Sequence, residues 1–313
     1  MAHPRKFRFG VQATAGTSAA EWRDFARKVE DLGYSTLFMP DHFIDTTFAP
    51  MTAICFAAAH TETLRVGHLV LGNDYKHPAI VAKEAATIDV LSDGRLEFGL
   101  GAGWMRTDYD ALGLPYDSPG TRIERLAEAL AVIKGAWGDG PVDFAGNHYT
   151  ITDYHGIPKP VQSPRPPILV GGGGPRLLRL AGREADIVGI NPNLRAGEIG
   201  PDAVKDALAE VTAKKIGWVR EGAGERFDDL ELQIRYFMSA VTDDPKGLAD
   251  ALAPGFGISS DDALASGVAL VGTVDGCIET LQQRRETWGV SYVVLGQDNF
   301  EAFAPVVAAL AGT

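Results

Sequence analysis

Hydrophobic and polar positions along the chain switch between two periods, and each switch marks a predicted strand followed by a predicted helix. Phe7–Gln12 is a short apolar run typical of a strand, and Ala19–Leu32 then carries apolar residues at helical spacing. Ser18 and Glu21 form a capping-box pattern at the start of this helix, and Gly33 supplies a stop at its end. The first unit is therefore predicted to be a strand, a loop and a helix.

The same unit recurs along the chain. The other strand-like runs are Ser35–Met39, Leu64–Leu71, Arg95–Leu100, Ile168–Val170, Ile187–Ile190, Leu232–Ala240 and Tyr292–Leu295. The helical stretches between them are Pro50–His60, Pro78–Leu91, Thr121–Trp137, Pro175–Ala181, Pro201–Arg220 and Val274–Trp288. Alternation of this kind predicts a parallel sheet. Eight strand-like runs favour a closed (β/α)8 TIM barrel over an open sheet.

Two stretches depart from this rhythm. Residues 138–167 are rich in Gly, Pro and aromatic residues and predict a small hairpin at Val142–Tyr149, whereas residues 251–272 read as irregular and Gly-rich. Both are interpreted as insertions, where substrate loops and lids occur. We therefore expect a single barrel domain over residues 1–313 with these two insertions.

Charge and composition narrow the possible partners. The net charge of −12 argues against nucleic acid or an anionic membrane as the main partner, because both require a basic face. Cys55 and Cys277 lie far apart and without metal-like spacing, as expected in a reducing cytoplasm. No signal-peptide pattern is present, and no run reaches the roughly 18 apolar residues of a membrane helix. A cytoplasmic protein with a small-molecule substrate is expected.

The first candidate for chemistry is the pair Asp41 and His42, directly after the second predicted strand. In a TIM barrel, residues at the carboxyl ends of the strands face the active-site mouth. An imidazole in that place can donate a hydrogen bond, move a proton or contact a cofactor. A structural histidine beside a helix-capping aspartate is the alternative.

The second candidate is a glycine bend after the strand Ile168–Val170, made of Gly171, Gly172, Gly173 and Gly174. Glycines let the backbone approach a ligand and adopt positive φ. Pro175 then begins a helix, whose free N–H groups favour an anion. The pattern indicates a phosphate site, with a flexible turn as the alternative. Because no Lys-Ser/Thr follows the glycines, the bend is not a nucleotide P-loop.

Two other turns follow strands. Gly99, Gly101 and Gly103 match only part of the dinucleotide fingerprint and follow the fourth strand, which makes them a weak Rossmann signal. They suit a turn where a flat ring meets the backbone, and Trp104 either stacks on such a ring or belongs to the core. From its residues alone, the loop 72–78 is best interpreted as an ordinary βα loop.

The histidines and serines offer no other catalytic pattern. The chain has seven histidines, but neither His-x-His nor His-Glu-x-x-His occurs, so no metal is expected. A Gly-x-Ser-x-Gly nucleophile motif is also absent from the sequence.

Three stretches in order resemble the luciferase-like monooxygenase superfamily, and more narrowly its F420-dependent oxidoreductase branch of actinobacterial type. They are Tyr34–Phe43, Ala79–Trp104 and Pro166–Gly189, and the likeness continues to Tyr292–Gly296. The resemblance implies a luciferase-like (β/α)8 barrel, commonly a homodimer, with a cofactor at the mouth. That cofactor would be the deazaflavin coenzyme F420, with FMN as the alternative.

The resemblance also implies roles for the candidate residues. Asp41 would contact the deazaflavin or the substrate, and His42 would be the catalytic group nearest the reacting centre. The cofactor phosphate would bind the glycine bend, at the amides of Gly172 and Gly173. The residues expected to shape the ring face are Gly72, Asn73, Gly101, Gly103 and Trp104. A non-proline cis peptide is expected near Gly72–Asn73.

One departure bears on the substrate. The glucose-6-phosphate dehydrogenase members carry an acid after the fourth-strand turn, where this chain has Trp104, and a Trp where it has residues 43–46. This argues against a sugar phosphate and favours an apolar, ring-shaped or alkenyl substrate. Three functions remain open: hydride transfer with F420, monooxygenation with FMN, and cofactor binding without catalysis.

Overall fold

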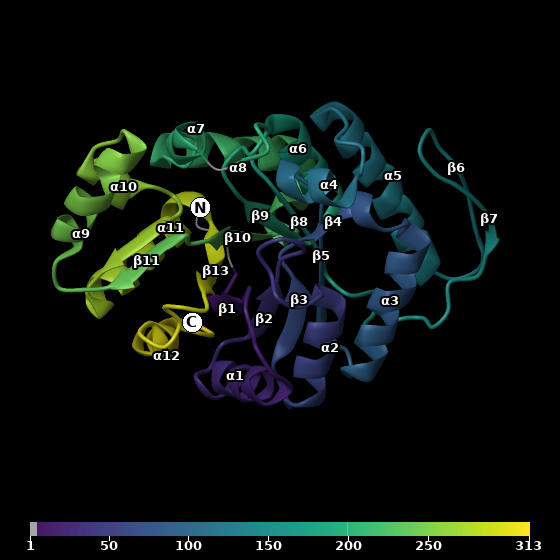
Figure 1. The fold of residues 1–313 in the computed structure, drawn as a ribbon, viewed down its shortest axis with the longest axis horizontal. Helices are drawn as coiled ribbons and strands as arrows, with labels where there is room; N and C mark the ends of the chain where they lie inside the picture. The colour runs from purple at the N-terminus through teal and green to yellow at the C-terminus, as the bar shows by residue number, and fades with distance from the viewer. Residues whose placement is uncertain (1–4, 199) are drawn as a thin grey trace.

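The computed structural model describes residues 5–198 and 200–313 and shows a closed barrel of parallel strands ringed by helices (Figure 1). The nine strands of its sheet have the order β3-β2-β1-β13-β10-β9-β8-β5-β4, and β3 also pairs with β5, which closes the barrel. Their bounds are β1 Arg8–Gln12, β2 Thr36–Met39, β3 Arg65–His68, β4 Leu71–Gly72, β5 Leu96–Gly101, β8 Ile168–Gly172, β9 Ile187–Ile190, β10 Glu231–Arg235 and β13 Val290–Gly296. Since β3 and β4 share one position beside β5, the predicted (β/α)8 TIM barrel is confirmed.

Helices cover the outside of this barrel (Figure 1). They include α1 Ala19–Asp31, α2 Pro50–Ala59, α3 Pro78–Leu91, α4 Arg106–Leu112, α5 Pro119–Trp137, α6 Pro175–Glu184, α8 Ala209–Ala223, α11 Val274–Trp288 and α12 Ala304–Leu310. The predicted cap of α1 is half confirmed. The Ser18 side chain accepts a bond from the Glu21 backbone N–H, but the Glu21 carboxylate accepts from Thr17 and not from Ser18.

Three predicted elements are each split in two. The predicted strand Leu64–Leu71 forms β3 and β4, and the predicted strand Leu232–Ala240 forms β10 and β11 (Met238–Val241). The predicted helix Pro201–Arg220 forms α7 (Pro201–Lys205) and α8. In each case the apolar pattern continues across the break, so periodicity alone misses the change in backbone direction.

The two predicted insertions have more structure than expected. Residues 138–167 contain the antiparallel hairpin of β6 (Val142–Ala145) and β7 (Thr150–Tyr154), which confirms the hairpin and lengthens it. The stretch 251–272, predicted to be irregular, contains η3 Ala253–Phe256, α10 Ser260–Ala265 and β12 Ala269–Gly272. With α9 (Pro245–Leu252) and β11 it forms a small lobe beside the barrel (Figure 1), because β12 pairs with β11 and not with the barrel.

Alternation along the strands separates two apolar layers. Outward positions such as Leu37 and Val293 join the large cluster between strands and helices. Inward positions form a second, smaller cluster inside the barrel, which comprises Phe38, Leu69, Leu169, Ile187, Tyr292 and Val294. The interior is therefore a filled core, and an opening for a ligand has to lie above or below it.

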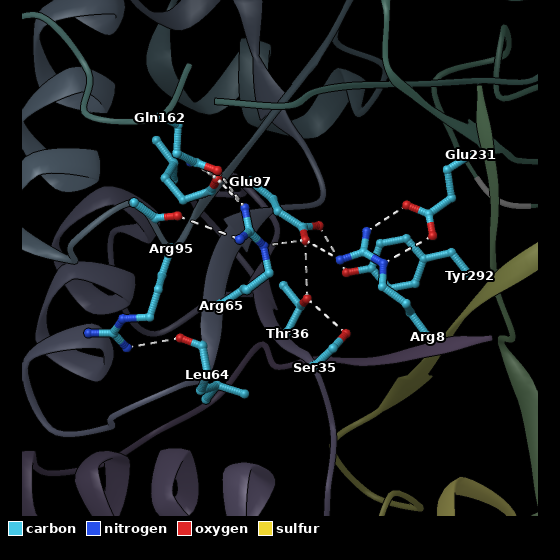
Figure 2. A network of polar contacts seen from close by, with 12 residues as sticks. Arg8, Ser35, Thr36, Leu64, Arg65, Arg95, Glu97, Gln162, Glu231 and Tyr292 are labelled. Atoms are coloured by element: carbon cyan, nitrogen blue, oxygen red, sulfur yellow. Dashed lines mark hydrogen bonds and ion pairs between the residues drawn. The ribbon is translucent and has the colours of Figure 1, made fainter. Parts of the chain in front are cut away.

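An ion-pair network closes the amino end of the barrel (Figure 2). The buried Glu97 carboxylate lies 2.6 Å from an Arg8 nitrogen and 2.7 Å from Arg65, and it accepts a bond from the Tyr292 hydroxyl at 2.9 Å. Arg8 also pairs with Glu231 at 2.6 Å. A cavity of about 650 Å³ lies against these residues. Because both signs of charge are matched here, this end is a structural plug.

Candidate active site

His42 and Asp108 form a hydrogen-bonded pair at the carboxyl end of the barrel. His42 lies in the loop after β2 and Asp108 in α4, and His42 Nδ1 is 2.7 Å from Asp108 Oδ2. The Asp108 side chain is fully buried, whereas 16% of the His42 side chain is exposed. A carboxylate accepts only, so Nδ1 carries the proton and Nε2 is left as the acceptor of the neutral ring. Nε2 has no hydrogen-bond partner among the described residues.

Asp108 is held by more than the imidazole. Its Oδ1 accepts the backbone N–H of Phe43 at 2.9 Å, so one carboxylate fixes both the His42 ring and the loop that carries it. Tyr75 lies nearby, and burial, together with the charges of Asp108, Asp41 and Asp74, raises the pKa of its hydroxyl well above its usual value. Sequence reasoning missed Asp108. The only signal was an acid four positions after Trp104.

Asp41 ties the second-strand loop to the third strand. Its Oδ2 accepts the backbone N–H of Gly72 at 3.1 Å. Burial raises the pKa of Asp41 despite this bond and the nearby Lys76 ammonium group. Gly72 cannot be replaced freely, since a Cβ there would lie 2.3 Å from the Tyr75 ring. Asp41 and Gly72 thus lie together at the mouth, and their contact with a cofactor remains a prediction.

A non-proline cis peptide is present at the end of the third strand, as expected, but it joins Leu69 and Val70, three residues before Gly72–Asn73. It falls between β3 and β4, within the apolar stretch Leu69–Leu71. Gln12 donates its Nε2 to the Leu69 carbonyl at 2.7 Å. The neighbouring strand also comes very close, because a Cβ on Gly99 would lie 1.8 Å from the His68 carbonyl oxygen. These contacts join strands that are distant in sequence, whereas the expected position of the bond came from the family resemblance.

Two glycines of the bend, Gly172 and Gly173, are required because neighbouring atoms come close, not because of their φ angles. In the described backbone none of its four glycines has positive φ, so that part of the sequence argument is wrong. A Cβ on Gly173 would lie 2.4 Å from the Pro192 backbone, and one on Gly172 would lie 2.5 Å from the Leu177 side chain. Gly171 faces the barrel interior near Val70, and Gly174 has open space.

The helix after this bend has a free amino end. Gly174 is the N-cap of α6, and no described side chain caps the helix there. Uncapped N–H groups and the helix dipole attract an anion such as a phosphate. Arg176 and Arg179 do not add to this, because they pair with Glu124 and Glu221 at 2.7 Å on the surface. The backbone of α6 alone could hold a phosphate.

The turn after β5 brings Trp104 to His42. Their rings are 5.5 Å apart and nearly perpendicular, which is an edge-to-face contact. Gly103 has a φ of +74°, and a Cβ there would lie 1.9 Å from the Tyr109 hydroxyl. Gly101 faces the interior below Val70. Trp104 is thus a neighbour of the catalytic candidate, and Gly103 is required by the turn itself.

Asn73 contacts the β6–β7 hairpin. Its side chain is buried and donates to the Tyr149 hydroxyl of the β6–β7 hairpin at 3.3 Å. Both residues line a groove of about 340 Å³, together with Asp74 and Arg125, which are paired at 2.8 Å. The structure therefore joins Asn73 to the hairpin, and its contact with a cofactor ring remains a prediction.

Glycines occupy inward positions at the floor of the mouth. The inward positions at the ends of three strands are glycines, Gly101, Gly171 and Gly296. Gln12 and Arg235 end β1 and β10, the two strands that flank β13. Side chains of neighbouring segments lie over these glycines, since a Cβ on Gly101 would lie 2.7 Å from Val70 and one on Gly296 would lie 2.8 Å from Arg235, so a planar group at this floor remains a prediction. The free end of α6 and the His42–Asp108 pair lie on the same face, because all these strands are parallel.

A metal centre finds no comparable support. Within residues 5–198 and 200–313, no group of three or more His, Cys, Asp or Glu side chains could hold a metal ion. Nor does that part of the chain contain a helix long and apolar enough to cross a membrane.

Comparison with known protein families shows to which family this chain belongs. Residues 5–253 match the model of the family described as luciferase-like monooxygenase. The chain belongs to the luciferase-like monooxygenase family. This family membership agrees with the resemblance found in the sequence motifs.

Named relatives of this family member use two cofactors. An F420-dependent glucose-6-phosphate dehydrogenase of Nakamurella multipartita is 30% identical over 79% of this chain and 72% of its own length. One of Microbacterium testaceum is 31% identical over 65% of this chain, and the match spans 63% of that relative. An FMNH(2)-dependent dimethylsulfone monooxygenase of Pseudomonas putida is 29% identical over 68% of this chain and 62% of its own length.

Solved structures support the fold of this family member. The coenzyme F420-dependent tetrahydromethanopterin reductase of Methanopyrus kandleri has a TM-score of 0.75 and 20% identity, over 98% of this chain and 99% of that one. An F420-dependent secondary alcohol dehydrogenase also has a TM-score of 0.75, with 19% identity over 97% and 99%. At such low identities the likeness concerns the barrel alone.

Proposed function

We propose that this protein is an F420-dependent oxidoreductase that transfers a hydride between the deazaflavin and a small organic substrate. The single observation that carries the proposal is the His42–Asp108 pair at the mouth of a luciferase-like barrel. Support also comes from two F420-dependent relatives at 30% and 31% identity. F420, when bound, supplies the hydride donor or acceptor.

The protein's own part is to bind, orient and move a proton. The backbone amides at the start of α6 and in the glycine bend would hold the cofactor phosphate, including those of Gly172, Gly173 and Gly174. The bare strand ends at Gly101 and Gly171 would receive the ring. These assignments are predictions that the binding experiments below test.

His42 is the proposed catalytic residue, and it would act at Nε2. Asp108 fixes the Nδ1 proton, so Nε2 is free to take a proton from a substrate hydroxyl, or to return one to a carbonyl oxygen. This suits alcohol oxidation or carbonyl reduction, because a proton leaves or joins oxygen while a hydride leaves or joins carbon. Burial of the Asp108 carboxylate makes it a positioning residue and keeps it away from the substrate.

The substrate need not be a sugar phosphate. Trp104 stands where the resemblance places an acid, and its ring lies against His42. The Asp108 carboxylate does not replace that acid, since both of its oxygens are already bound to His42 and Phe43. We therefore propose an apolar, ring-shaped or alkenyl substrate beside Trp104.

An FMN-dependent monooxygenase is the second candidate. The observation in its favour is the match to an FMNH(2)-dependent relative over 68% of this chain. The same phosphate site and ring platform would serve FMN. Oxygen-dependent product formation would separate this reaction from hydride transfer with F420.

Titration of the purified protein with F420 and, separately, with FMN tests the proposal directly. The fluorescence of each cofactor reports binding. Micromolar affinity for F420 with no binding of FMN is expected. Binding of FMN alone, with oxygen consumption in the presence of a flavin reductase, would move the assignment to the second candidate. Tight binding without turnover of any tested substrate would favour a non-catalytic barrel.

We also propose a homodimer in the cytoplasm, since dimers are common among barrels that this chain resembles. Light scattering of the purified protein at several concentrations tests the first point, and cell fractionation with a specific antibody tests the second. Neither result affects the assignment of the cofactor.

A further inference from the structure

The segment Asn191–Asn193, directly after β9, lies against the glycine bend. The Asn191 backbone N–H donates to the Gly172 carbonyl at 2.9 Å. A Cβ on Gly173 would lie 2.4 Å from the Pro192 backbone, which is the closest approach between the two segments at that glycine. A ligand held by the backbone of the bend would therefore lie beside Asn191–Asn193 as well.

The Asn193 side chain presents a donor to the amino end of α6. Its Oδ1 accepts the Arg195 backbone N–H at 3.2 Å, so Nδ2 is the amide atom left over. A Cβ on Gly174, the N-cap of α6, would lie 3.7 Å from that Nδ2. A capping side chain offers an oxygen to the free N–H groups of a helix, whereas here an NH2 group faces them.

This arrangement leaves an acceptor missing. Nδ2 of Asn193 makes no hydrogen bond within the part of the chain that the structure describes, and no described side chain caps α6. Asn193 is exposed, so its amide is open to a ligand from solvent. Donors that face each other without an acceptor between them are suited to an anion with several oxygens, such as a phosphate.

The buried Lys215 of α8 fixes this segment in place. Its side chain is 1% exposed, and Nζ donates to the backbone carbonyls of Asn191 at 2.9 Å and of Asp206 at 2.7 Å, and to the Asp206 carboxylate. The same carboxylate accepts the Asn193 backbone N–H at 2.6 Å. An ammonium group has three donors, and all three are used here. One buried ion pair therefore holds both ends of Asn191–Asn193.

We propose that Asn193 binds the cofactor phosphate through Nδ2, opposite the amino end of α6, and that Lys215 is the positioning residue that keeps Asn193 there. The inference rests on the proposed function. A phosphate accepts hydrogen bonds from several N–H groups at once, so the amide adds a bond to those from the bend and from α6. Because the amide is neutral, its contribution depends on where Nδ2 lies, and the Lys215–Asp206 pair sets that position.

The test compares the affinity for F420 with the affinity for the same ribityl deazaflavin without the phosphate and the groups attached to it, by fluorescence titration. The ratio of the two affinities reports the contribution of the phosphate end. Asn193→Asp puts a negative charge in the same place and should lower the ratio about tenfold or more, whereas Asn193→Ala removes only the donor and should lower it about threefold. Lys215→Met should also lower the ratio, whereas a lysine with a merely structural role would weaken the binding of both compounds equally.

Lys134→Met is the matched control, because Lys134 also pairs with a carboxylate and donates to a carbonyl, both of Glu184, at the other end of α6. It should leave the ratio unchanged. An unchanged ratio in both Asn193 variants overturns the inference while the wild type still binds F420. An unchanged ratio in Lys215→Met overturns the positioning role, and Asp206→Asn, which weakens the same ion pair, decides this point should Lys215→Met not fold.

The proposed function can fail separately. If the wild type binds FMN in place of F420, the ratio of FMN affinity to riboflavin affinity gives the same test of Asn193 and Lys215. If the wild type binds none of these compounds, the proposed function itself fails, and the inference fails with it.

Discussion

His42 and Asp108 lie 66 positions apart in sequence and 2.7 Å apart in the structure. The contact joins the loop after β2 to the helix after β5, across the intervening third strand. Because the partner of Nδ1 is a buried carboxylate, the tautomer of His42 is determined, and so is the nitrogen that faces a substrate. The pair turns a histidine near a barrel mouth into a defined proton acceptor.

Replacing Asp108 by Asn should reverse that tautomer. The amide oxygen would keep the bond from the Phe43 N–H, which leaves the amide nitrogen to donate to His42 Nδ1. Nε2 would then carry the proton and could no longer accept one. We expect kcat to fall about tenfold or more and the KM and the F420 affinity to change little; His42→Ala should lower kcat by about 10² or more. Steady-state kinetics measures both, and equal losses in kcat and in F420 affinity would contradict the role.

A negative charge at the amino end of α6 should block the phosphate site. Gly174 can accept a side chain, since a Cβ there meets only the Asn193 amide at 3.7 Å. Gly174→Asp caps the helix and repels an anion, whereas Gly174→Asn caps it with no charge. The Asp variant should bind F420 at least about tenfold more weakly than the Asn variant, as measured by fluorescence titration. Equal F420 affinities of the two variants would show that the cofactor phosphate does not bind at the amino end of α6.

The ion-pair network at the amino end of the barrel should make the stability of the fold depend on pH. Burial raises the pKa of Glu97, but Arg8 and Arg65 outweigh burial and hold it below its ordinary value of 4.5. A carboxyl whose pKa is lower in the folded chain stabilises the fold fully above that value, and the effect is lost as the pH falls through the lowered pKa. Glu97→Gln should cost about 3 kcal/mol at pH 7 and less at lower pH, as measured by urea unfolding.

The matched control for this network is Glu84→Gln. Glu84 pairs with Lys76 at 2.8 Å, and both side chains are exposed. Removing an exposed pair should change the free energy of unfolding by less than about 1 kcal/mol at any pH. If both variants behave alike, Glu97 does not hold the amino end together.

Two glycine-to-alanine substitutions should change the free energy of unfolding in opposite directions. A Cβ on Gly99 would lie 1.8 Å from the His68 backbone oxygen, so Gly99→Ala should separate β5 from the third strand and cost about 3 kcal/mol or more. Gly217 lies within α8 with nothing near its missing Cβ. Gly217→Ala should stabilise the chain by about 0.5–1 kcal/mol, since alanine is the better helix former. Thermal unfolding of both variants checks the contrast.

The order of strands and helices could be predicted from the sequence because it is written in local periodicity. Apolar runs such as Phe7–Gln12 and amphipathic stretches such as Ala19–Leu32 report their own burial, whatever they pack against. The repetition of that unit was enough to predict a closed parallel barrel. Where the pattern continued through a break, as in Leu232–Ala240, the same local signal hid the departure of β11 from the barrel.

The sequence by itself determined the barrel and the placing of His42 and the glycine bend at the carboxyl ends of its strands, because each is fixed by residues close together in the chain. Only the tertiary structure decided that Asp108 orients His42, that the cis peptide joins Leu69 to Val70, and that Lys215 holds Asn191–Asn193 beside the glycine bend. These facts are distances between strands and loops far apart in sequence. Closure of the sheet into a barrel sets these distances, so no local pattern of residues can predict them.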